Sequence, residues 1–511
     1  MPRDRPNLLF IWTDQQARDT LGVYGNDRIE TPHLDAVAHE SAVFEHAYVS
    51  QPVCTPARGT VMTGQYPHET GVVCNNTPLA RTDWCFPELG AFEDYRSCWI
   101  GKWHLGDEIY HQHGFDEWIA TEDGYHPFYE AENDRSERSA YYHFLVDNGF
   151  EPDVTDEGQD HFSRGFAARL PEKYSKPHFM ADRAIEFMEA CGNEPFILHL
   201  MFLEPHPPYT SPRDDQYDPA DVELPPNFEH DGMADQIDKV RFCRELVRRG
   251  IRHATRDPQL LSAPPQEPEW RELISNYWGL VSLVDTHVGR VLNAVQGAGM
   301  WDETITVFTS DHGDMMGSHQ LFSKMVMFQE AIRVPLLLRL PGNPATGDRI
   351  DAPISQVDLV PTLLAAMNQP IPSDLHGQDW GPYLRGEAEL EEPRVFVQWN
   401  GATAFGMHDR NSPKYPEWSQ PRAEPEAEAI WNELFDRDIM RTMTTPVRTV
   451  ITPDGWKLNY RRSGEHELYD LGTDPHETEN LAWSTEHTAK IYSLYQHIVD
   501  WQRRTRDPVY L

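Results

Sequence analysis

The sequence has few cysteines, few lysines and no long apolar run. Six cysteines scattered through 511 residues do not make the dense framework of a disulfide-rich protein. Only eight of the 44 basic residues are Lys, and 82 acidic residues bring the formal net charge to −38. Such a charge argues against nucleic acid and anionic membrane surfaces as partners. Because no apolar run approaches the roughly 20 residues of a membrane span, we expect a soluble protein.

The chain begins with a short apolar run at residues 8–12 that lacks a small-residue cleavage site. We interpret this run as a first strand, not as a signal peptide. If Met1 is the native start, the protein is expected to be cytoplasmic and its cysteines mostly reduced. The sequence carries no signal for an oligomeric state.

Apolar runs alternate with amphipathic stretches over the first three quarters of the chain, which is typical of an α/β protein whose sheet is covered on both faces. Strands are expected at 8–12, 97–100, 196–202, 304–308 and 334–340. Helices are expected at 33–41, 181–190, 270–295 and 358–367. Two long polar segments, 105–175 and 205–268, are expected to be loop-rich insertions on the substrate side of the site.

The character of the sequence changes near residue 390. Strand-like stretches follow at 394–398, 448–452 and 456–460, the last two separated by a Pro-Asp-Gly turn, and the chain ends in a helix-like stretch at 485–504. We therefore expect a catalytic domain at 1–389 and a smaller α+β subdomain with an antiparallel sheet at 390–511.

Chemically capable side chains directly follow four of the expected strands. They are Asp14 and Gln15 after the first strand, Lys102 and His104 after the second, His206 after the third, and Asp311 and His312 after the fourth. In open α/β sheets, ligands bind outside the carboxyl ends of the strands. The sequence therefore predicts that these residues share one site.

Asp14, Gln15, Asp311 and His312 offer two carboxylates, an amide oxygen and an imidazole. An oxygen-rich set of this kind suits Ca²⁺, Mg²⁺ or Mn²⁺ better than zinc. An Asp after a strand is also a common helix N-cap, so each residue taken alone has an ordinary structural explanation.

Cys54 lies in a Pro-containing loop that is expected to lead into a helix. The free N–H groups at a helix N-terminus favour a bound anion, and Arg58, four residues on, could reach the same anion. A small buried thiol is the other interpretation. The spacing alone leaves both open.

The motifs resemble those of the type I sulfatases, within the alkaline phosphatase superfamily. The segment Cys54-Thr-Pro-Ala-Arg58 resembles the Cys-x-Pro-x-Arg signature, and Gly101-Lys-Trp-His-Leu-Gly106 resembles the second signature of that family. Residues 310–335, which include Lys324, resemble its metal-binding region, and residues 456–481 resemble its C-terminal subdomain. The resemblance covers nearly the whole chain. It implies an alkaline-phosphatase-like α/β/α sandwich with a large mixed sheet and a smaller C-terminal antiparallel sheet.

The resemblance also implies the cofactors. Cys54 would be oxidised by a formylglycine-generating enzyme to formylglycine, whose hydrate is the nucleophile. One divalent cation, Ca²⁺ in first place and Mn²⁺ or Mg²⁺ as alternatives, would be held by Asp14, Gln15, Asp311, His312 and the residue at position 54.

The remaining roles come from the same resemblance. Arg58 and Lys102 would stabilise the alkoxide at position 54, and His104 would be the base that releases sulfate. His206 and Lys324 would bind the sulfate and protonate the departing alcohol. Asn75 falls where related hydrolases place a residue that contacts the substrate.

Two positions depart from many sulfatases, which have a second Asp where this chain has Gln15 and an Asn where it has His312. This pair is similar to phosphonate monoester and phosphodiester hydrolases of the same superfamily, but those enzymes lack the Lys and His that this chain keeps at 102 and 104. We therefore expect a sulfatase that hydrolyses a sulfate monoester of a carbohydrate or another small or aryl alcohol. The alternatives are a phosphonate monoester or phosphodiester hydrolase, and a catalytically silent protein that binds an oxyanion on the same fold.

Overall fold

The computed structural model describes residues 5–130, 132–156, 158–230, 238–248, 266–342, 347–390, 393–401 and 444–511. None of the described helices combines the length and apolar character needed to cross a membrane. All six cysteines are among the described residues, and each is free and buried.

The core of the fold is an eight-stranded mixed sheet. Its strand order is β12 (Arg349–Ile350), β2 (Ala42–Phe44), β11 (Leu336–Arg339), β9 (Thr304–Ser310), β1 (Asn7–Asp14), β8 (Phe196–Pro205), β4 (Arg96–Gly101) and β5 (Glu117–Ala120). Only β11 runs antiparallel to its neighbours in this sheet. The five strands from β9 to β5 are parallel, so their carboxyl ends meet at one edge.

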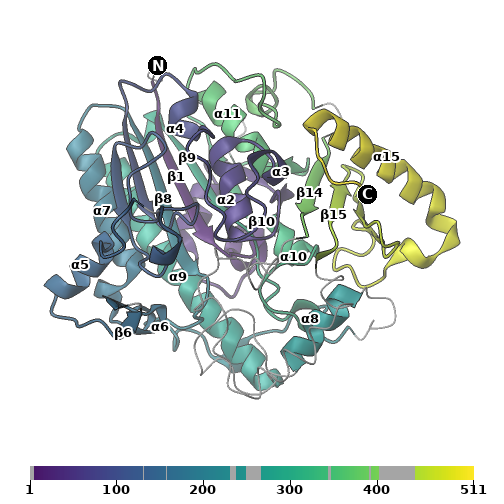
Figure 1. The fold of residues 1–511 in the computed structure, drawn as a ribbon, viewed down its shortest axis with the longest axis horizontal. Coiled ribbons are helices and arrows are strands. Elements are labelled where there is room, and N and C mark those ends of the chain that lie inside the picture. The colour runs from purple at the N-terminus through teal and green to yellow at the C-terminus, as the bar shows by residue number, and fades with distance from the viewer. Residues whose placement is uncertain are drawn as a thin grey trace.

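Helices cover both faces of this sheet, because successive side chains of a buried strand point to opposite sides. Along β1, Leu8 and Phe10 pack in a core with α2 (Cys54–Thr63) and α11 (Leu359–Ala366). The alternate residues pack with α1 (Pro32–Ala38), α7 (Lys176–Cys191) and α9 (Glu267–Gly297). Figure 1 shows α7 and α9 on one side and α2 and α11 on the other, which confirms the α/β/α sandwich.

The expected strand at 334–340 was wrong in one respect, because the structure divides it at Pro335. The part before the proline, β10 (Arg333–Val334), joins β3 (Ala47–Tyr48) and β13 (Ile354–Ser355) in a separate three-stranded sheet, and only β11 belongs to the large sheet. A proline has no N–H for a ladder hydrogen bond, so the chain changes sheets there.

The two polar insertions contain short elements. The first insertion includes β5 of the large sheet, and the others are α5 (Ala140–Asp147), β6 (Val154–Asp156), β7 (Gln159–His161), α6 (Arg164–Ala168) and α8 (Asp238–Arg248). The other short helices are α3 (Pro67–Thr70), α4 (Phe86–Leu89), α10 (Gln329–Ile332) and α12 (Gly381–Leu384). Residues 231–237 and 249–265 of the second insertion lie outside the described part of the chain.

The C-terminal part forms a separate, four-stranded antiparallel sheet, as expected. Its strands follow chain order: β14 (Val395–Trp399), β15 (Val447–Ile451), β16 (Trp456–Tyr460) and β17 (Glu467–Asp470). One face lies under α15 (Thr488–Thr505), where Ile498 and Trp501 pack on Val450 and Leu458. The other face adds its apolar residues to the core of the large sheet. In Figure 1, α15 is the yellow helix on the outside of this sheet.

A fully buried ion pair holds the end of the chain to this sheet. The Arg448 guanidinium binds both carboxylate oxygens of Asp507, at 2.5 and 2.7 Å, and neither side chain is exposed. Removing one partner leaves the other charge buried and unpaired, which typically costs about 3–5 kcal/mol.

Arg448→Met is therefore expected to lower the free energy of unfolding by about 3–5 kcal/mol. Urea denaturation followed by tryptophan fluorescence measures this loss. The control is Arg503→Met, which removes an exposed ion pair with Asp500 and should change stability by about 1 kcal/mol or less. Equal losses in the two variants would contradict the assignment.

Candidate functional site

The ends of two neighbouring parallel strands bring the metal-ligand candidates together. Thr13 of β1 pairs with Ser310 of β9, so Asp14 and Asp311 leave the sheet side by side. Both carboxylates are completely buried, as is His312. The backbone at Gln15 turns with φ at +67°, and its N–H donates to Asp311 Oδ1 at 3.0 Å.

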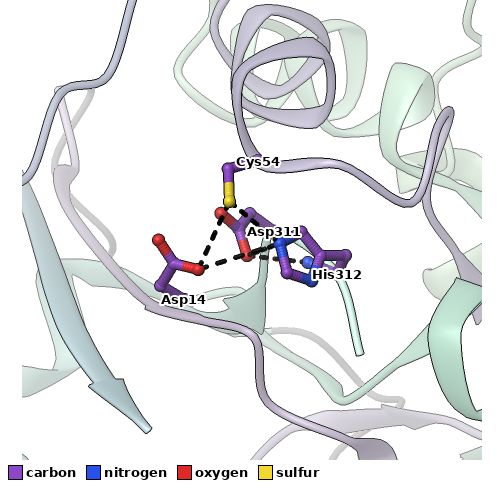
Figure 2. Close-up of side chains that lie close together, drawn as sticks. All are labelled: Asp14, Cys54, Asp311 and His312. Atoms are coloured by element: carbon purple, nitrogen blue, oxygen red, sulfur yellow. Dashed lines mark hydrogen bonds and ion pairs between the residues drawn. The ribbon is translucent and has the colours of Figure 1, made fainter. Parts of the chain in front are cut away.

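Cys54 approaches these residues from the other side, at the first residue of α2. Its Sγ lies 3.2 Å from His312 Nε2 and 3.7 Å from Asp14 Oδ1. Figure 2 shows Asp14, Cys54, Asp311 and His312 pointing toward a common centre. Their ligand atoms lie within 4.8 Å of one another.

Arg58, one turn along α2, joins the two strand ends. Its Nε donates to Asp311 Oδ2 at 2.9 Å and its Nη2 to Asp14 Oδ2 at 2.8 Å. Its Nη1 donates to the Lys102 carbonyl at 2.7 Å, and Lys102 Nζ donates to Asp14 Oδ2 at 2.5 Å. These two cations therefore contact the carboxylates, and Lys324 is the cation that contacts Cys54, with Nζ 3.1 Å from Sγ.

The charges in this cluster favour anions at its centre. Burial alone would raise the pKa of Asp14, but the Lys102 and Arg58 cations outweigh it and hold that pKa well below its usual value. Burial and Asp14 act to raise the pKa of the Cys54 thiol, but Lys324, Lys102 and His312 lower it to about 7. Negative charge at position 54 is therefore stabilised before any metal ion is considered.

The donor set fits a divalent cation. His312 Nδ1 donates to the Gly313 carbonyl at 2.9 Å, so in the neutral ring the lone pair is on Nε2, which faces the carboxylates. The Gln15 amide nitrogen donates to Asp314 and Tyr209, which directs its oxygen to the opposite side, where Lys324 binds it at 2.6 Å. Such outer partners are what orients metal ligands.

The two other histidines line the site without bonding to its centre. His104 Nε2 lies 2.9 Å from Asn76 Oδ1, and burial with Lys102 and Arg58 holds its pKa well below the usual value. His206 Nδ1 donates to the Pro207 carbonyl at 2.8 Å, and burial lowers its pKa strongly as well. Both imidazoles are therefore neutral at pH 7.

Asn75 lies in a turn after α3, beside the start of α2, where its Oδ1 accepts a hydrogen bond from the Thr55 N–H at 3.1 Å. The neighbouring Asn76 is the residue that contacts His104. Among the described residues, no hydrogen bond joins Asn75, His104 or His206 to Cys54 or to the two Asp carboxylates.

Sequence reasoning missed the residues that position the site. Asp314 Oδ2 accepts from Gln15 Nε2 and from the Tyr209 hydroxyl, both at 2.6 Å. Glu108 accepts from the backbone N–H groups of Trp103 and His104, both at 2.6 Å, and so shapes the loop after β4. Asp314 stands within the Ser-Asp-His-Gly-Asp run, but nothing in that run shows which group it would hold.

Comparisons with known proteins show the family of the chain. The profile of the Sulfatase family matches residues 6–369, and the chain belongs to this enzyme family. The uncharacterized sulfatase YidJ of Escherichia coli is 29% identical over 99% of this chain and 88% of its own length. An N-acetylglucosamine-6-O-sulfatase of Bacteroides thetaiotaomicron is 25% identical over 98% of this chain and 87% of its own.

A solved structure shares the fold. The phosphonate monoester hydrolase SpPMH from Silicibacter pomeroyi superposes with a TM-score of 0.77 at 23% identity, over 99% of this chain and 96% of that one.

Asp314→Asn tests whether this carboxylate orients a metal ligand. The variant places an amide N–H₂ against the N–H₂ of Gln15, so the Gln15 amide must turn or lose its partner. Divalent cation affinity, measured calorimetrically with Mn²⁺, is expected to fall about 10–100-fold. Asp215→Asn, at an exposed carboxylate, is the control and should bind as the parent does. An unchanged affinity in Asp314→Asn would show that the contact is only structural.

Proposed function

We propose that the protein is a sulfatase that hydrolyses a sulfate monoester with a formylglycine nucleophile made from Cys54. The observation that carries this proposal is the position of Cys54 Sγ, buried where His312, Asp14 and Lys324 converge. The thiol stands in for the formylglycine oxygen. The proposal requires a formylglycine-generating enzyme for maturation. All proposed site residues lie in the proposed catalytic domain, 1–389.

The charge of the site suits an anionic ester. Three buried cations, Arg58, Lys102 and Lys324, and three buried carboxylates, Asp14, Asp311 and Asp314, lie in the site. These charges balance, and a divalent cation held by Asp14, Gln15, Asp311, His312 and position 54 would add two positive charges. Such an ion would supply Lewis acidity at the nucleophile and at the ester oxygens. Its identity is proposed as Ca²⁺, with Mn²⁺ and Mg²⁺ as the alternatives.

Side chains of the protein would then carry out the proton transfers. Lys324 reaches position 54 and is placed to bind the sulfate oxygens and protonate the departing alcohol. His104 is neutral, as a base must be before it takes a proton. The Nδ1–H of His206 is committed to a carbonyl, so this residue donates to the ester only when its Nε2 is also protonated, a state that a bound anion favours.

A phosphonate monoester or phosphodiester hydrolase is the second candidate. It is favoured by Gln15 and His312 in the metal-ligand set, which carry less negative charge than paired carboxylates. The buried Lys102 and the neutral His104 favour the sulfatase.

The two candidates differ in the preferred ester. We expect kcat/KM for 4-nitrophenyl sulfate to exceed that for 4-nitrophenyl phenylphosphonate. Peptide mass spectrometry over residue 54 should find an aldehyde in place of the thiol, and Cys54→Ala should reduce turnover of both esters to background. Preference for the phosphonate would favour the second candidate. An unmodified Cys54 after expression with the maturation enzyme would favour a catalytically silent oxyanion-binding protein.

A small pocket lies beside His206. Its lining is mostly apolar and includes Leu203, Leu280 and Leu283, beside the polar side chains of Arg164, Lys176, Glu204 and His206. Arg164 keeps about a third of its side chain exposed while it binds Glu122 at 2.7 Å. Lys176 is paired with Glu122 as well, and Glu204 is an acid in the lining, so the pocket carries no excess of positive charge by itself. We propose a sulfated carbohydrate because that is the substrate class named for the B. thetaiotaomicron relative, and we propose the partly exposed Arg164 as the cation that contacts an anionic substituent of the sugar.

Arg164→Met tests this substrate class. Loss of one charged hydrogen bond to an anionic sugar substituent should lower kcat/KM for a disulfated glucosamine about 10–100-fold. Turnover of 4-nitrophenyl sulfate, which cannot reach that group, should change little. Arg138→Met is the control, because Arg138 lies in the same insertion but binds Gln159. A parallel loss on both substrates would mean that Arg164 acts on the fold instead.

A further inference from the structure

A second cluster of metal-binding side chains lies apart from the site around Cys54. It consists of Cys85, immediately before α4, Glu88 within α4, and His113 in the loop between β4 and β5. The thiol, carboxylate and imidazole ligand atoms lie within 4.8 Å of one another. Cys85 is completely buried, His113 is 5% exposed, and the Glu88 side chain is 29% exposed.

His113 is the member of this cluster that protein contacts do not satisfy. Both of its ring nitrogens are buried without a hydrogen-bond partner. Nδ1 is 3.5 Å from Glu88 Oε2, and that oxygen already accepts a hydrogen bond from the Cys85 N–H at 2.9 Å. A buried polar group without a partner typically costs about 1–3 kcal/mol. The backbone of His113 also has φ at +53°, a conformation that residues with side chains seldom adopt.

His199 shows what an ordinary core histidine looks like in this chain. It is also buried, and both of its nitrogens are also unpartnered. It stacks on Phe10 at 4.9 Å and on Trp99 at 5.9 Å, and burial is the only cause of its lowered pKa. His113 differs because an acid and a thiol share its surroundings.

We propose that Cys85, Glu88 and His113 form a second cation site, which binds zinc through the Cys85 thiolate, the Glu88 carboxylate and an imidazole nitrogen of His113. Sulfur, nitrogen and oxygen donors together suit zinc, whereas Ca²⁺ and Mg²⁺ prefer oxygen alone. Binding breaks the S–H bond of Cys85 and releases its proton to solvent, while the sulfur lone pair forms the bond to zinc. Asp83, two residues before Cys85, is a further carboxylate near enough to act electrostatically on Cys85 and His113.

The position of this cluster gives the ion a structural role. His113 contacts the ring of Trp103 with centroids 5.7 Å apart. Trp103 lies between Lys102 and His104, in the loop whose backbone Glu108 holds. A zinc ion at Cys85 would thus tie α4 to the segment that carries two residues of the proposed active site. This role does not depend on which ester the enzyme hydrolyses.

The test uses the full-length chain with Cys54→Ser, which removes the thiol from the first site. Metal-free protein is titrated with Co²⁺, and a thiolate-to-cobalt charge-transfer band is recorded in the near ultraviolet. We expect the band in this background, and we expect its loss in Cys85→Ser and His113→Gln. Cys74→Ser is the matched control, since Cys74 is also a buried thiol but binds Thr77, and it should keep the band.

X-ray absorption of the zinc-loaded Cys54→Ser chain gives a second measurement that needs no further variant. The proposal expects sulfur in the zinc coordination shell. Any one of three results would overturn the proposal: no charge-transfer band in the Cys54→Ser chain, a band that survives Cys85→Ser, or a zinc coordination shell without sulfur. Far-UV circular dichroism of each variant separates loss of the site from loss of the fold, and if Cys85→Ser is unfolded the absorption result decides.

Discussion

The site depends on the Arg58 guanidinium, which donates hydrogen bonds to two buried carboxylates at once. One nitrogen binds the end of β1 at Asp14, another binds the start of the segment after β9 at Asp311, and a third binds the Lys102 carbonyl after β4. Three strand ends and the first turns of α2 are therefore held in one arrangement by a single side chain. A planar group with fixed donor directions can do this, whereas the point charge of a lysine cannot.

This arrangement is a poor way to gain stability. Three carboxylates and three cations are withdrawn from water, and the desolvation of buried charges can exceed their mutual attraction. Hydrophobic packing on both faces of the sheet must supply the stability that such a cluster does not. Buried charges of this kind are better explained by ligand binding. A divalent cation and an anionic ester would pair with the charged side chains of the site.

Much of the fold could be predicted from local pattern. The continuous apolar runs at β1, β8 and β9 and the amphipathic stretch at α9 are strong signals, and they predicted a sheet covered on both faces. The change of sheet at Pro335 was not predicted, because an apolar run does not show which strand it pairs with. The strand β17 was not among the expected strands, since Glu467 and Asp470 at its ends suggest a loop.

The sequence predicted which residues form the candidate site, but not how their atoms are arranged. Polar residues at strand ends showed which side chains would meet, because parallel strands end at the same edge. The structure brings Asp14, Gln15, Cys54, Asp311 and His312 together, but sequence spacing does not tell which atom faces which. The roles of Asp314 toward Gln15 and of Glu108 toward His104 depend on hydrogen bonds between distant segments. Such contacts have no local signature.

The environment of position 54 explains why one cysteine of six could serve as a nucleophile precursor. All six are buried, and burial raises the pKa of a thiol, as it does strongly for Cys85 and Cys98 and to about 11 for Cys191 and Cys243. Only at Cys54 do neighbouring cations reverse that effect and lower the pKa to about 7. The same field acts on any negative atom placed there. A thiolate, the deprotonated oxygen of a hydrated aldehyde and the oxygens of an ester anion all carry negative charge, so the surroundings that stabilise one stabilise the others.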